Sequence, residues 1–216
     1  RLLLIADNFT QPEVARRVIL SVRAGVRWVQ LRDHLASSDD FDAMSMKLVY
    51  ELTKIDNKTL ISVNSRIKVA QLHDLPFHTG ANGPTFFESK LVLGPEAQIG
   101  LSTHDGKELA NAVREKAAYV TFSPIFPTTS HPDTKPVGLD VLRNVCHHAT
   151  MPVMAMGGIT PSKVQGCLNV GAHGVANHLQ QILYSAELLK DTNVEFLLIG
   201  QGMQKDSLIE LRDKKY

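Results

Sequence analysis

The order of its apolar segments is the feature that most constrains how this chain can fold. Short apolar runs that end in polar residues alternate with helical stretches of about a dozen residues. The strand-like runs cover 2–7, 27–33, 59–64, 77–80, 98–104, 119–126, 152–158 and 173–177. Strands that alternate with helices pair in parallel through right-handed crossovers, so eight such units predict a closed (β/α)8 barrel of the TIM type. An open doubly wound sheet is the alternative.

Composition limits the kinds of partner. Hydrophobic residues make up 44% of the chain, and no apolar run approaches the roughly 20 residues of a membrane span. No signal peptide is recognisable, so a cytoplasmic protein without a membrane partner is expected. The 23 basic and 22 acidic residues give a net charge of +1, which offers no field for nucleic acid. Any anion binding is therefore expected to be local.

Polar residues follow the predicted strands, which in a barrel of this type is where a site is built. They include Gln30 and Arg32, Asn64, Ser102, and a long loop with Thr128, Thr129, Ser130, His131 and Lys135. A rim rich in cations and hydroxyls is typical of phosphate or diphosphate sites. Gly157 and Gly158, before a helix opened by Thr160 and Pro161, would let backbone amides approach a phosphate.

Five motifs occur in a fixed order: "WVQLRD", "IGLSTHD", "YVTFSPIFPTTSHP", "PVMAMGGITPSKV" and "GAHGVA". Together they resemble the thiamine phosphate synthase family, including its thiazole tautomerase branch, over about Leu2 to Ala176. The resemblance implies a (β/α)8 barrel that binds small phosphorylated ligands. The implied reaction joins a pyrimidine methyl diphosphate to a thiazole phosphate and releases pyrophosphate, with magnesium as cofactor.

The resemblance also implies roles for single residues. Gln30, Arg32, Asn64 and Ser102 would form the pyrimidine diphosphate pocket, under a loop with Thr128 and Thr129. Gly157 and Gly158 would hold the thiazole phosphate through backbone amides. The residues expected to act on the reacting groups are Arg32, His131 and Lys135.

Several positions depart from the family pattern. Ser65 stands where an aspartate magnesium ligand is expected, and Ala81, Asn82 and Gly83 replace an acidic group. A hard dication needs anionic oxygen ligands, so no residue is assigned to a metal, and these departures count against the synthase activity. The tautomerase branch needs no metal, but its loop histidine is Pro124 here; His34, His104 and His131 are nearby substitutes. A degenerate or engineered barrel without catalysis is a further alternative.

The last residues have a pattern of their own. A helix over 179–190, the apolar strand "VEFLLI" over 194–199 and a helix over 204–214 are predicted. This tail weakly resembles a helix–strand–helix piece of two-domain glycosyltransferases, which would make the chain a chimera of a 1–178 barrel and a 179–216 tail. The strand is expected to join the barrel sheet as an extra strand, or to pair with a second copy and form a homodimer.

Overall fold

The computed structural model describes residues 1–128 and 133–178, whose strands form one parallel sheet closed on itself. The strands follow one another in chain order around the barrel. They are β1 (Leu2–Asp7), β2 (Trp28–Arg32), β3 (Leu60–Asn64), β4 (Phe77–Thr79), β5 (Ile99–Thr103), β6 (Tyr119–Phe122), β7 (Val153–Met156) and β8 (Gly174–His178). The predicted (β/α)8 barrel is therefore confirmed, and the open doubly wound sheet is excluded.

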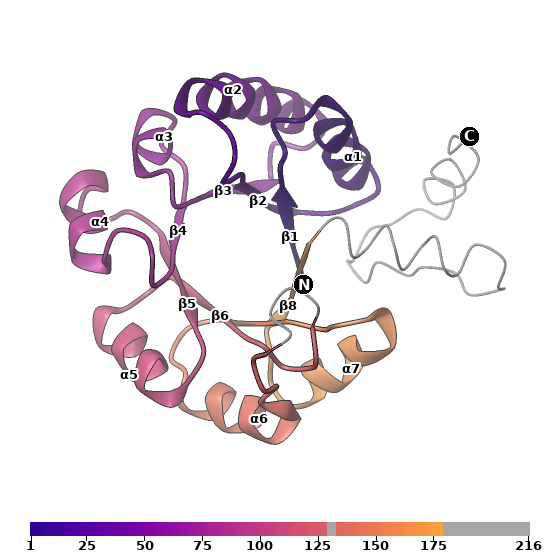
Figure 1. Cartoon of the computed structure of the whole chain (residues 1–216), viewed down its shortest axis with the longest axis vertical. Helices are drawn as coiled ribbons and strands as arrows, with labels where there is room; N and C mark the ends of the chain where they lie inside the picture. Colours follow the sequence, from indigo (N-terminus) through magenta and orange to yellow (C-terminus); the bar gives the residue numbers. More distant parts are fainter. Residues whose placement is uncertain (129–132, 179–216) are drawn as a thin grey trace, which may run out of the picture. The chain divides into compact units, whose positions relative to one another are not determined.

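A helix follows each of the first seven strands, as Figure 1 shows. The helices are α1 (Pro12–Arg23), α2 (Ser38–Ile55), α3 (Ile67–Leu72), α4 (Phe86–Leu93), α5 (Gly106–Glu115), α6 (Gly138–His148) and α7 (Pro161–Asn169). The extra strand and helix predicted within 179–216 lie outside the described residues. They stay predictions, as does the division into a 1–178 barrel and a 179–216 tail.

The described chain divides into two compact units, and the first comprises residues 1–62 with His178. Here β1 pairs with β2, so that Asp7 stands opposite Arg32 where both strands end. Helices α1 and α2 pack against each other. The ring of Phe41, in α2, meets the Phe9 ring edge-on, with centroids 4.8 Å apart, and both rings are fully buried. This apolar packing supports the loops that follow β1 and β2.

The second unit comprises residues 63–177 and contains the pairs from β4 to β8. Its register places His78, Gly100 and Tyr119 in one row across β4, β5 and β6. Neighbours in such a row share a face of the sheet. The row therefore brings a histidine and a tyrosine to either side of a residue without a side chain.

Sequence periodicity did not predict helix α4. Its exposed apolar residues, which include Phe87 and Leu91, leave no clear division between a buried and an exposed face. The signal that could have found it is the "TFFE" segment, in which Thr85 accepts from the Glu88 amide and Glu88 accepts from the Thr85 amide. Such a reciprocal pair marks a helix start.

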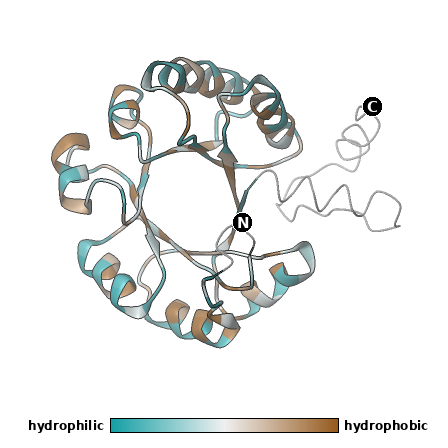
Figure 2. Cartoon of the chain, viewed as in Figure 1, coloured by the Kyte–Doolittle hydropathy of each residue, from teal (hydrophilic) through white to brown (hydrophobic). Residues whose placement is uncertain are grey.

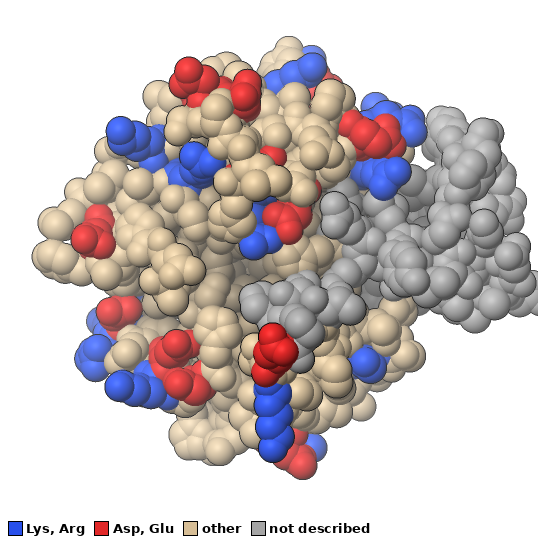
Figure 3. Space-filling model, viewed as in Figure 1, with Lys and Arg blue, Asp and Glu red and all other residues tan. Residues whose placement is uncertain are grey.

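Apolar residues form the core, and most charged residues lie on the surface. Figure 2 shows hydrophobic and hydrophilic residues mixed along the helices, whereas the core is built from apolar residues of the strands and the inner helix faces. None of the described helices is long and apolar enough to cross a membrane. On the face drawn in Figure 3, basic and acidic side chains of the described residues are interspersed. No broad basic surface is visible there that would attract a polyanion.

Candidate functional site

In the first unit, the ends of β1, β2 and β8 carry an ionic cluster. One carboxylate oxygen of Asp7 lies 2.5 Å from Arg32 Nη1 and 3.2 Å from His178 Nδ1. Burial alone would raise the pKa of Asp7, but the hydrogen bond from His178 and the charges of Arg32, His178 and His34 hold it below its ordinary value of 3.8. Arg32, predicted from the sequence, is thus held by a carboxylate that sequence reasoning did not single out.

Asp33, which follows β2, is a second carboxylate in this unit, and its oxygens accept hydrogen bonds from two loops. Oδ2 accepts from the Thr10 hydroxyl at 2.6 Å, and Oδ1 accepts from the amides of Leu35 and Ala36 at 3.0 Å each. Burial would raise the pKa of the Asp33 carboxyl, but these hydrogen bonds outweigh it and hold the pKa below 3.8. Asp33 therefore stays ionised and fixes the turn between β2 and α2.

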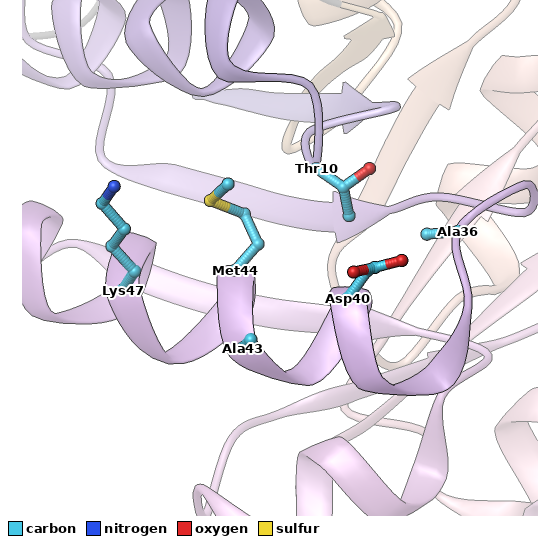
Figure 4. A pocket seen from close by; sticks show the side chains of 6 residues that line it. All are labelled: Thr10, Ala36, Asp40, Ala43, Met44 and Lys47. Carbon is cyan, nitrogen blue, oxygen red and sulfur yellow. The ribbon is translucent and has the colours of Figure 1, made fainter.

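A shallow pocket of about 380 Å³ lies beside this loop, as Figure 4 shows. The side chains of Asp40, Met44 and Lys47 rise from one face of α2. Thr10 lines the pocket from the loop after β1, and Ala36 lines it from the loop after β2. The Thr10 hydroxyl already donates to Asp33, and Asp40 accepts from Ser37. None of the residues predicted for phosphate binding lines this pocket.

In the second unit, Ser102 lies in a hydrogen-bonded row with two partners. His78 Nε2 is 3.0 Å from Ser102 Oγ, and His78 Nδ1 is 3.0 Å from the Tyr119 hydroxyl. His78 and Tyr119 are buried, whereas Ser102 is half-buried. The predicted substrate-binding hydroxyl is thus backed by an imidazole and a phenol. Tyr119 was not among the residues predicted from the sequence.

The corner after β3 contains Asn64 and Ser65. The Ser65 hydroxyl donates to Asn64 Oδ1 at 3.1 Å. Ser65 has a φ of 60°, in the left-handed region, and its amide bonds the carbonyl of His78 at 2.9 Å. The two side chains therefore bond each other, and this corner carries no carboxylate.

The turn after β7 is built from glycine by necessity. Gly157 and Gly158 have φ values of 92° and 62°. A Cβ on Gly157 would lie 2.7 Å from Pro124 Cα, and one on Gly158 would lie 2.2 Å from the Pro127 carbonyl oxygen. The loop after β6 thus lies directly on the turn, and the Phe126 amide bonds the Gly157 carbonyl at 3.0 Å. Only glycine fits at either position.

Carbonyl groups of this turn are occupied, whereas some amides are not. Lys163 Nζ donates to the Gly158 carbonyl and Asn177 Nδ2 to the Ile159 carbonyl, each at 3.0 Å. Within residues 1–128 and 133–178, no group accepts from the amides of Gly158 and Ile159. Thr160, before α7, makes no side-chain cap. Amides without a protein acceptor just before a helix are suited to an anion.

The other predicted residues differ in burial, and two of them are not described by the structure. Gln30 is buried in the middle of β2, and Thr128 is half-buried in the loop after β6. Lys135 is exposed further along that loop. His34 is exposed, and His104 Nδ1 lies 2.9 Å from Glu108 at the start of α5. Thr129 and His131 lie outside the described residues.

Comparison with known proteins gives a consistent result. The family model for thiamine monophosphate synthase matches residues 2–179. The chain belongs to this family. A putative thiamine-phosphate synthase 2 of Aquifex aeolicus is 34% identical over 160 residues, which cover 72% of this chain and 82% of that protein. The structure of a thiamine phosphate pyrophosphorylase from Pyrococcus furiosus has a TM-score of 0.74, covers 88% of this chain and 96% of its own, and is 23% identical, so it shows the shared fold.

The family relationship also bears on the C-terminal residues. A thiamine-phosphate synthase of Clostridium acetobutylicum aligns over 211 residues at 26% identity, covering 95% of this chain and 97% of its own length. That coverage extends beyond residue 178 into the predicted tail.

The residues present do not fit the magnesium ion that the resemblance implies. Among the described residues, no three His, Cys, Asp or Glu side chains are grouped so as to hold a metal ion. The corner after β3 offers only the amide of Asn64 and the hydroxyl of Ser65. In the first unit, Asp7 binds Arg32 and His178, and Asp33 serves its own loop. Magnesium prefers carboxylate oxygens that are free to coordinate it.

Proposed function

We propose that the chain binds a thiazole phosphate and joins it to a pyrimidine methyl diphosphate. The thiazole nitrogen would attack the methylene carbon, and the carbon–oxygen bond would break so that pyrophosphate leaves with the electron pair. The observation that carries the proposal is the turn after β7. Two glycines that accept no side chain form this turn, and the amides of Gly158 and Ile159, just before α7, have no acceptor among the described residues.

Groups at other strand ends suit the departing diphosphate. A guanidinium has five donors, and only Nη1 of Arg32 is engaged by Asp7, so further donors remain for phosphate oxygens. Ser102 and Asn64 would bind the pyrimidine diphosphate in the second unit. Donors directed at oxygens that gain charge as the bond breaks lower the barrier of such a displacement. No step in this proposal is assigned to a metal.

Pyrophosphate release tests the condensation. With both substrates, the protein should release pyrophosphate, and Ser102→Ala and Arg32→Gln should each lower kcat/KM at least tenfold. Ser38→Ala, an exposed change at the start of α2, is the matched control and should leave the rate unchanged. Pyrophosphate at background level, with or without added magnesium, would show that the chain does not perform this reaction.

The pair formed by Asp7 and His178 favours a second candidate, a metal-free proton transfer on a thiazole phosphate. A carboxylate that holds Nδ1 of an imidazole orients Nε2 as a general acid or base. The imidazole would take a proton from one ring atom and return it to another, so no redox partner is needed. Isomerisation followed by NMR without metal should fall about a hundredfold in His178→Gln. An unchanged rate in that variant excludes the dyad.

A further inference from the structure

A buried hydrogen-bonded row crosses three strands of the second unit. The His78 imidazole lies between two hydroxyls, with Nδ1 3.0 Å from Tyr119 Oη and Nε2 3.0 Å from Ser102 Oγ. The rings of His78 and Tyr119 stack with an interplanar angle of 28° and centroids 5.4 Å apart. His78 is 2% exposed and Tyr119 is 5% exposed. Both imidazole nitrogens are therefore used inside the protein.

Gly100 makes this row possible. His78, Gly100 and Tyr119 are direct neighbours in the register of β4, β5 and β6. A Cβ on Gly100 would lie 2.2 Å from Cζ of Tyr119, so the phenol ring occupies the space that a side chain on β5 would fill. Tyr119 thus reaches across β5 to His78. The contact is fixed by strand register and does not depend on a loop conformation.

The direction of the hydrogen bonds follows from what each group can donate. A neutral imidazole has one N–H and one lone pair, so both bonds of the row run the same way. A buried phenolic proton requires an acceptor, and Nδ1 of His78 is one at 3.0 Å. If Tyr119 donates to Nδ1, then Nε2–H donates to Ser102 Oγ. The half-buried Ser102 then keeps its own proton for another acceptor.

We propose that Tyr119 is a positioning residue that holds His78 in the tautomer protonated at Nε2 and so presents the Ser102 hydroxyl as a donor to an anionic substrate oxygen. Hydrogen bonds in series polarise one another, so the terminal hydroxyl becomes a stronger donor than an isolated serine. The part that concerns substrate rests on the proposed condensation. The part that concerns His78 does not.

Nitrogen NMR of the ligand-free protein tests the tautomer directly. With ¹⁵N-labelled histidine, His78 should show Nε2 bonded to hydrogen and Nδ1 as an acceptor. Tyr119→Phe removes the donor but keeps a stacking ring, and should return His78 to a mixture of tautomers. Ser102→Ala should leave the Nε2–H form unchanged, because Tyr119 sets it. Tyr50→Phe, on the exposed face of α2, is the matched control.

Three results would overturn the proposal: an Nδ1–H form in the wild-type protein, no change in Tyr119→Phe, or a tautomer that changes in Ser102→Ala. If Tyr119→Phe does not fold, the tautomer of His78 in the wild-type protein still tests the proposal. In the pyrophosphate assay, Tyr119→Phe should lower kcat about tenfold, as loss of one hydrogen bond predicts. If the tautomers behave as expected while the wild-type protein releases no pyrophosphate, the condensation is wrong and the role of Tyr119 toward His78 stands.

Discussion

Two strand ends of the second unit, after β7 and after β3, differ in what a ligand would contact. The turn after β7 offers backbone amides, and its glycines are fixed by contact with the backbone of Pro124 and Pro127. The corner after β3 offers the side chains of Asn64 and Ser65, which bond each other. A site made of amides depends on chain geometry, whereas a site made of carboxylates depends on a few side chains.

This difference would explain why the resemblance to the family holds at the turn after β7 and fails at Ser65. Any substitution at Gly157 or Gly158 would disturb the packing of two loops, so folding itself retains the turn. Ser65 is half-buried, and its hydroxyl donates to its neighbour Asn64. Such a position can lose a carboxylate without loss of the fold.

The largest expected effect comes from adding a side chain to the glycine turn after β7. Gly158→Ala places a Cβ 2.2 Å from the Pro127 carbonyl oxygen at a φ of 62°. Overpacking against backbone and the left-handed conformation should together lower the free energy of unfolding by about 2–4 kcal/mol. Denaturant unfolding measures this. Calorimetry with inorganic phosphate should also show that the variant loses the millimolar-range binding expected of the wild-type turn.

Gly94→Ala is the matched control, because Gly94 has a φ of 94° but no atom lies within 4 Å of its added Cβ. It separates backbone strain from the clash with the loop. With a ψ of 162°, Gly94 lies in a region almost restricted to glycine, so the control should lower stability by about 1–3 kcal/mol and leave phosphate binding intact. Phosphate binding that survives in Gly158→Ala, or that is lost equally in Gly94→Ala, would contradict the interpretation of the turn.

An intermediate effect is expected from restoring a carboxylate after β3. Ser65→Asp fits the local backbone, since aspartate tolerates the left-handed φ of 60° better than most residues. The variant should bind magnesium at least tenfold more tightly than the wild-type chain, as measured by calorimetry, and release more pyrophosphate when magnesium is present. Ser65→Asn has nearly the same shape without the charge and should change neither. Equal magnesium affinity in all three proteins would place the missing ligands elsewhere.

Sequence patterns predicted what depends on local order along the chain. The alternation of apolar runs and helical stretches was enough for the eight strands, and the glycine pair before Thr160 indicated the turn. Helix α4 was missed because its apolar residues lack one buried face, although the Thr85–Glu88 capping pair marked its start.

Partners across the sheet were beyond sequence reasoning. Tyr119 meets His78 only because register places Gly100 between them. Asp7 meets His178 only because the first and last described strands contribute to one unit. Such contacts depend on barrel closure, which periodicity predicts as a class of fold but not as a set of distances.

The smallest effect is expected from Asp33, the carboxylate whose oxygens bind Thr10 and the loop after β2. The folded pKa of Asp33 lies below 3.8, so its stabilisation is fully present above about pH 4 and is lost as the pH falls through the folded value. Asp33→Asn should lower the free energy of unfolding at pH 7 by about 1 kcal/mol. Asparagine has only one acceptor oxygen, so it cannot accept both from the Thr10 hydroxyl and from the amides of Leu35 and Ala36. Between about pH 5 and pH 2 the stability of this variant should decline less steeply than that of the wild-type protein. Urea titrations at each pH measure both quantities, with Asp39→Asn, an exposed residue of α2, as the control for loss of one charge. Parallel pH profiles for wild type and Asp33→Asn would show that Asp33 is not committed to its loop, and would reopen it as a ligand for the cation that the corner after β3 cannot hold.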